Sequence, residues 1–154
     1  MKIISKNPYT VYLAGKMDTL TYDEIMEQRE RIKDKLKKYN IQVRNPLRGK
    51  EGLKNVGKIE SGKIYAQFSI NEIVQRDLRD VELSNAVLVM TGDTHSWGTV
   101  GEFYYATWVT KTPTLVICKR PSLWVEKFAT KVVPDEEIAI KTLYNWSLHW
   151  DNWE

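Results

Sequence analysis

Apolar residues in this chain fall into short unbroken runs separated by longer amphipathic stretches. β-branched and aromatic residues predict strands at four of these runs: YTVYLAG (9–15), IQVRNP (41–46), AVLVM (86–90) and TLVICK (114–119). The run 86–90 contains no polar residue, which is typical of a parallel strand covered by helices on both faces.

Helical spacing appears between the runs. The stretch 21–40 places four residues on one helix face and its charged residues on the others: Ile25, Ile32, Leu36 and Tyr39. Thr21, followed three positions later by Glu24, resembles a capping box at the start of this helix.

Three further helices are predicted, over 69–85, about 99–111 and 141–152. The first has Ser69 as its cap and five residues facing inward: Ile70, Ile73, Val74, Leu78 and Val81. Residues 47–66, rich in Gly and Lys without a clear period, predict a loop. The alternation of strand and helix predicts an α/β fold, a doubly wound, flavodoxin- or Rossmann-like parallel sheet with helices on both faces. We expect one domain over 1–154, with a C-terminal helical tail from about 137 to 154.

Composition narrows the class of protein. The net charge of +3 is too small to indicate a nucleic acid polymer or a membrane as the partner. The chain has no apolar run long enough to span a bilayer. Its single cysteine, Cys118, lies in an apolar run and is interpreted as strand packing; it excludes an internal disulfide framework and suits a reducing cytosol. We therefore expect a cytoplasmic protein.

Ligands of such folds bind where strands end and helices begin, which indicates 15–18, 45–50 and 91–102. Asp77 falls on or near the apolar stripe of its helix, where a carboxylate is costly unless it is paired or faces a cleft. It could instead pair with Arg76 or Arg79 at the rim.

Glu102 is a lone acid in THSWGTVGEFYYA (94–106), followed directly by Phe103, Tyr104 and Tyr105. It could be a helix-start residue that interacts with the macrodipole, or it could be a reagent. The aromatic neighbours are interpreted as core packing.

Three segments taken in order carry a family resemblance: VYLAGKM (11–17), RDLRDVELSNAVLVM (76–90) and SWGTVGE (96–102). Together they resemble the nucleoside 2-deoxyribosyltransferase superfamily, which includes the 2'-deoxynucleoside 5'-monophosphate N-hydrolases. The resemblance covers roughly residues 9 to 118. It implies retaining cleavage of an N-glycosidic bond, with Glu102 as nucleophile, Asp77 assisting proton transfer or orienting the sugar, and Tyr12 positioning Glu102. It also implies a parallel-sheet fold in a homo-oligomer, a dimer or higher.

The chemistry suits these residue types. Departure of the base builds oxocarbenium character on the sugar, which an ionised carboxylate stabilises and captures. A second acidic group can protonate the leaving base. We expect no cofactor and no metal, since His95 and His149 are far apart and lack partner spacing.

The substrate could be a deoxynucleoside or a deoxynucleotide. Ser96 stands six positions before Glu102, where the resemblance implies a carboxylate in transferases and a phosphate-binding serine in hydrolases. With the amides of residues 99–101 it would form a phosphate cradle at a helix N-terminus. Lys16 replaces a serine of the hydrolases and either pairs with phosphate or is solvent-exposed, while Asp93 could serve the sugar 5'-hydroxyl.

We therefore expect transfer of a 2'-deoxyribosyl group between nucleobases, with the monophosphate N-hydrolase as the alternative. A non-catalytic nucleotide-binding module is a lesser alternative, and no flavin or phosphoacceptor pattern supports a flavodoxin-like interaction domain. The expected substrate-binding residues are Gly15, Lys16, Asp93, Ser96, Trp97, Gly98 and Thr99. Trp97 either walls the base or sugar pocket or anchors its loop. The stripe of Trp146, Trp150 and Trp153 docks either on a neighbouring subunit or on its own domain.

Overall fold

A five-stranded sheet organises the computed structural model, which describes residues 7–15, 20–46, 70–91 and 96–150. Its strands are β1 (Tyr9–Gly15), β2 (Ile41–Arg44), β3 (Ala86–Met90), β4 (Thr114–Ile117) and β5 (Lys131–Val133). All four neighbouring pairs are parallel, in the order β2-β1-β3-β4-β5. This is the flavodoxin-like order, and the direction of winding reverses between β1 and β3, where such folds bind ligands.

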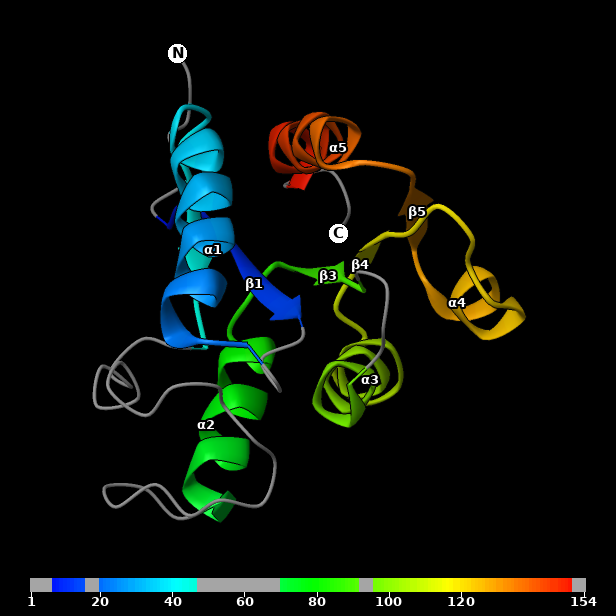
Figure 1. Cartoon of the computed structure of the whole chain (residues 1–154). Coiled ribbons are helices and arrows are strands. Elements are labelled where there is room, and N and C mark those ends of the chain that lie inside the picture. Colours follow the sequence, from blue (N-terminus) through cyan, green and yellow to red (C-terminus); the bar gives the residue numbers. More distant parts are fainter. Residues whose placement is uncertain (1–6, 16–19, 47–69, 92–95, 151–154) are drawn as a thin grey trace.

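Helices cover both faces of the sheet (Figure 1). They are α1 (Tyr22–Lys37), α2 (Ile70–Glu82), α3 (Trp97–Tyr104), the π-helix η2 (Tyr105–Thr110), α4 (Leu123–Phe128) and α5 (Glu136–His149). α1 and α5 share one face, and α2, α3, η2 and α4 lie on the other. The predicted doubly wound α/β fold is confirmed.

Each central strand contributes to two cores, because successive side chains point to opposite faces of a sheet. Leu13 and Leu88 join Leu143 of α5 in one core. Tyr12 and Val87 belong to the other core, beneath α2 and η2. The side chain of Tyr12 therefore faces α2 and η2, which come more than fifty residues later in the sequence.

α1 begins as the sequence predicts. The Thr21 hydroxyl accepts the Glu24 amide at 3.2 Å, and the Glu24 carboxylate accepts the Thr21 amide at 2.8 Å, which completes the capping box. The inward placement of Tyr39 was wrong: its side chain is 41% exposed and its ring lies 4.5 Å from that of Tyr144. The helix ends at Lys37, so Tyr39 no longer follows the helical period.

α2 differs from its prediction at its N-terminal half. Val74 was expected to face inward but is 48% exposed, and every residue from 71 to 76 is exposed or half-buried. The buried face instead lies later in the helix and carries two acids, Asp77 and Asp80, beside Val81. In this later part, Val81 belongs to the same core as Ala106 of η2, and Asp80 pairs with Arg44 at 3.6 Å. The predicted cap Ser69 lies outside the described residues.

The C-terminal half contains elements that were not predicted. α3 begins at Trp97, two residues early, and continues as η2 until Lys111 adopts a left-handed φ of 56°. α4 and β5 were not predicted at all. α5 begins at Glu136, ahead of the helix expected from 141 but close to the expected start of the helical tail at about 137.

The C-terminal tryptophans pack within the chain. Trp146 and Trp150 lie against the core beneath α1 and α5, and Trp150 meets Tyr9 edge-on at 5.5 Å. These two residues therefore follow the own-domain interpretation, while Trp153 lies outside the described residues.

Candidate active site

Tyr12 and Glu102 meet in a direct hydrogen bond. Tyr12 extends from the middle of β1 and is completely buried, and Glu102 is half-buried in the second turn of α3. The phenol donates to Glu102 Oε1 at 2.9 Å. The docking of α3 on β1 and β3 thus brings together two residues that are 90 positions apart in the sequence.

The surroundings of Tyr12 keep its phenol protonated. Burial is the main cause that raises the pKa of Tyr12 well above its ordinary value of 10.0, followed by the charges of Glu102 and Asp77. A phenol that keeps its proton remains a hydrogen-bond donor at neutral pH. Its bond to Oε1 can then fix the orientation of the Glu102 carboxylate.

Asp77 lies near this pair, on α2. Its side chain is buried, at 6% exposure, and its charge acts on both Tyr12 and Arg29. This position differs from the exposed rim considered in the sequence, where Arg79 instead pairs with Glu82 at 3.6 Å. The structure therefore brings the three expected catalytic residues into one neighbourhood on the same face of the sheet.

Arg29 is a fourth member that the sequence interpretation missed. It is 1% exposed, on α1, and it interacts electrostatically with Glu102, Tyr12 and Asp77. A signal was available, because Arg29 stands four residues after Ile25 and three before Ile32, on the buried stripe itself.

The start of α3 is built by Ser96 and Thr99. Ser96 is the N-cap: its Oγ accepts the Thr99 amide at 3.2 Å and lies 2.8 Å from the Thr99 hydroxyl. The segment Gly98–Gly101 lies at the start of this helix. A Cβ added at Gly98 or Gly101 would meet no atom within 4 Å, so open space lies beside this segment.

The remaining expected binding residues divide into three cases. Trp97 is 92% exposed at the surface of the single chain. Gly15 ends β1, and an added Cβ there would lie 3.2 Å from Met90 Cε and 3.3 Å from Arg29 Nη2. Lys16 and Asp93 lie outside the described residues.

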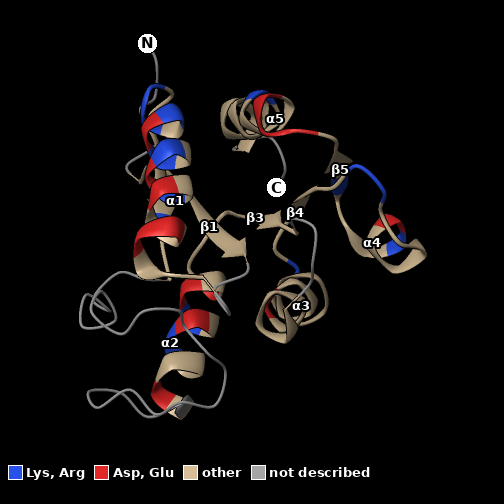
Figure 2. Cartoon of the chain, viewed as in Figure 1, with Lys and Arg blue, Asp and Glu red and all other residues tan. Residues whose placement is uncertain are grey.

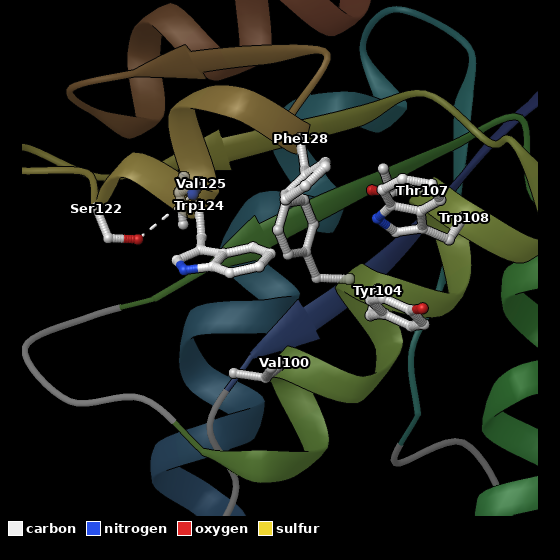
Figure 3. A pocket seen from close by; sticks show the side chains of 9 residues that line it. Val100, Tyr104, Thr107, Trp108, Ser122, Trp124, Val125 and Phe128 are labelled. Atoms are coloured by element: carbon white, nitrogen blue, oxygen red, sulfur yellow. Dashed lines mark hydrogen bonds between the residues drawn. The ribbon is translucent and has the colours of Figure 1, made fainter.

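An aromatic pocket of about 230 Å³ lies between α3–η2 and α4 (Figure 3). Trp124 and Phe128 of α4 face Tyr104 and Trp108 across it. Glu102 is not among its lining residues, so this pocket is distinct from the Tyr12–Glu102 pair. It also shows that Tyr104 is not core packing, because that side chain is 59% exposed.

Among the described residues, no group of three or more His, Cys, Asp or Glu could hold a metal ion. None of the described helices is both long and apolar enough to cross a membrane.

Known structures share this architecture. The 2-desoxiribosyltransferase from Leishmania mexicana matches 90% of this chain and 98% of its own, with a TM-score of 0.62 at 14% identity. The 2-deoxyribosyltransferase from Bacillus psychrosaccharolyticus matches 87% and 95%, with a TM-score of 0.61 at 14% identity. The CMP N-glycosidase BcmB of Clostridium botulinum matches 87% and 97%, with a TM-score of 0.55 at 13% identity. No protein-family model and no curated protein matches the chain in sequence. The resemblance to the nucleoside 2-deoxyribosyltransferase superfamily is thus confirmed as a likeness of fold.

Proposed function

We propose that this chain cleaves the N-glycosidic bond of 2'-deoxyribonucleosides and transfers the sugar to another nucleobase through a covalent deoxyribosyl–Glu102 intermediate. The observation that carries this proposal is the hydrogen bond from the buried Tyr12 phenol to Glu102, with Asp77 buried nearby. The fold shared with two 2-deoxyribosyltransferases supports it.

In the first step, Glu102 Oε2 attacks the anomeric carbon of the sugar. The bond from that carbon to the base nitrogen breaks, and its electron pair leaves with the base. Asp77 delivers or directs the proton that neutralises the departing base. Tyr12, bonded to Oε1, holds the carboxylate in line, which is the role of an orienting group beside a nucleophile.

In the second step, a nitrogen of the incoming base attacks the same carbon, its proton is lost by the reverse of the route through Asp77, and Glu102 leaves as a carboxylate. Two successive inversions retain the configuration of the sugar. The substrate-contacting residues in this proposal are Gly15, Lys16, Asp93, Ser96, Trp97, Gly98 and Thr99.

A monophosphate N-hydrolase is the second candidate. Ser96 at the N-terminus of α3 favours it, because helix N-termini attract phosphate, and the CMP N-glycosidase shares the fold. Water would then replace the incoming base. A non-catalytic nucleotide-binding module is the lesser candidate, since binding alone does not require a tyrosine that orients a carboxylate.

One assay separates the candidates. The protein is incubated with deoxyadenosine, dAMP or dCMP, with and without a free acceptor base, and the products are separated by chromatography. Base exchange on the nucleoside supports the transferase, and base release from monophosphates alone supports the hydrolase. Absence of both reactions, under varied conditions, contradicts a catalytic role.

Substitution of the two acids tests the mechanism. Glu102→Gln should lower turnover by at least about 10³-fold, because it removes the nucleophile. Asp77→Asn should lower turnover by about 10²-fold or more, with the largest loss on bases that need protonation. Glu82→Gln, at a more exposed acid on α2 that pairs with Arg79, is the matched control and should retain activity.

Mass spectrometry of the quenched wild-type reaction should show a deoxyribosyl adduct on Glu102. Turnover near the wild-type rate in Glu102→Gln would rule out the covalent route. We also propose that the protein is a homo-oligomer, dimer or higher, which sedimentation velocity measures directly.

A further inference from the structure

Arg29 is a charged side chain enclosed by the protein. It is 1% exposed in the middle of α1, a helix along which Figure 2 shows many charged residues, most of them exposed. Burying a guanidinium costs several kcal/mol unless its donors are satisfied. Such a residue therefore requires specific partners.

Those partners are main-chain carbonyls at the end of β1. Nη1 donates to Leu13 O at 2.8 Å, and Nη2 donates to Gly15 O at 3.3 Å. The Nε donor has no hydrogen-bond partner among the described residues. The fork of Arg29 thus fixes two of the three carbonyls that follow Tyr12 in the strand, those of Leu13 and Gly15.

Gly15 makes room for this arrangement. A Cβ at that position would approach Nη2 to 3.3 Å and Met90 Cε to 3.2 Å, both closer than ordinary contacts. The guanidinium is therefore confined between the strand end and its neighbours, which makes its charge a fixed feature of the site.

Two carboxylates from two other elements interact electrostatically with this charge. They are Glu102 of α3 and Asp77 of α2, and the neutral Tyr12 phenol, next to Leu13 in β1, donates its hydrogen bond to Glu102. Two neighbouring carboxylates disfavour one another's ionised form unless a cation offsets their repulsion. Arginine suits that role because it stays protonated even in buried sites.

We propose that Arg29 is a positioning residue of the site: its fork fixes the end of β1 next to Tyr12, and its buried charge keeps Glu102 ionised beside Asp77. The kinetic consequences rest on the proposed function, whereas the ionisation of Glu102 can be measured without any turnover.

The direct experiment is a titration of the Glu102 carboxyl by ¹³C NMR in protein labelled at glutamate, with Glu102→Gln assigning the signal. Arg29→Gln keeps an amide donor but removes the charge, and should raise the pKa of Glu102 by about 1 unit or more. Arg29→Lys keeps the charge and should leave that pKa within about half a unit of the wild-type value. Arg31→Gln, on the same helix but half-exposed and paired with Glu136, is the matched control and should cause no shift.

A folded Arg29→Gln protein with an unchanged Glu102 pKa would overturn the inference. If Arg29→Gln does not fold, the Arg29→Lys variant decides. A shift of about 1 unit in the Glu102 pKa, although the positive charge is retained, would overturn the inference. An unchanged Glu102 pKa supports it. In turnover assays the acid limb of the pH–kcat profile should move upward in Arg29→Gln, which loss of packing alone would not produce. A wild-type protein that turns over no substrate contradicts the proposed function, while the NMR result still decides the role of Arg29.

Discussion

Tyr12 combines a packing role and a polar role in one side chain. Its ring lies in the core beneath α2 and η2, and its hydroxyl reaches Glu102 at the edge of that core. Tyrosine suits this position because it has an apolar body and a polar tip, so the polar tip finds a partner when the residue is buried. The same burial couples the fold to pH.

Stability should decline in strong alkali. Burial raises the pKa values of Tyr9 and Tyr12 above the ordinary 10.0, so above that pH the unfolded chain loses protons that the folded chain keeps. The stabilising contribution is complete below pH 10 and is lost as the pH rises toward the folded-state pKa values. Each tyrosine should lower the free energy of unfolding by up to about 1.4 kcal/mol per pH unit.

Urea unfolding between pH 9 and 11.5 measures this slope. Tyr9→Phe, which keeps the ring, should flatten it. Equal slopes in the wild-type and variant proteins would contradict the linkage.

At the residue scale, the sequence pointed to Asp77 and Glu102 but not to Arg29. Asp77 and Glu102 were recognisable because a carboxylate among apolar neighbours is conspicuous, and the family resemblance added Tyr12. Arg29 was hidden because its partners are the carbonyls of Leu13 and Gly15, which every residue possesses and no sequence displays. The position of Arg29 on the buried face of α1 could be predicted from the sequence, but the carbonyls that it contacts could not.

Among the helices and strands, α1 is the element that the local sequence predicts best. Its capping box, buried stripe and basic last turn are all local, so they can be predicted from the sequence. Surface ion pairs from Arg31 and Lys35 to Glu136 then connect it to α5. α4 and β5 escaped prediction because segments of six and three residues are too short to show a period. The π-helix η2 was not predicted because its wider turn depends on tertiary packing.

Removal of the α1 cap should cost measurable stability. Thr21→Ala leaves the Glu24 amide without its side-chain acceptor and should lower the free energy of unfolding by about 1 kcal/mol. Glu24→Gln, which retains an acceptor for the Thr21 amide, should cost less. A shift of the urea midpoint in Glu24→Gln equal to or larger than that in Thr21→Ala would contradict the capping assignment.

At the scale of the whole molecule, the sheet separates two hydrophobic cores, and only one of them adjoins the candidate site. One core lies beneath α1 and α5, and the other contains Tyr12 and underlies the candidate site. The fold class followed from the alternation of strands and helices, whereas the strand order and its reversal between β1 and β3 required the structure.

A cavity in the first core should weaken the fold without changing the chemistry. Leu143 is fully buried in α5, and Leu143→Ala should lower the free energy of unfolding by about 3 kcal/mol. Turnover per folded molecule should remain near the wild-type value at a temperature where the variant stays folded. Leu148→Ala, at a 57% exposed position of the same helix, should change stability by less than about 0.5 kcal/mol.

The 90-residue separation between Tyr12 and Glu102 has a consequence for the newly made chain. Their hydrogen bond closes a loop that contains β2, α2 and β3, so it forms only after two crossovers have laid parallel strands on either side of β1. Such non-local pairing is slow compared with the formation of α1. During synthesis, the phenol of Tyr12 can therefore bond to Glu102 only after α3 has left the ribosome, and a chain arrested before α3 lacks this hydrogen bond.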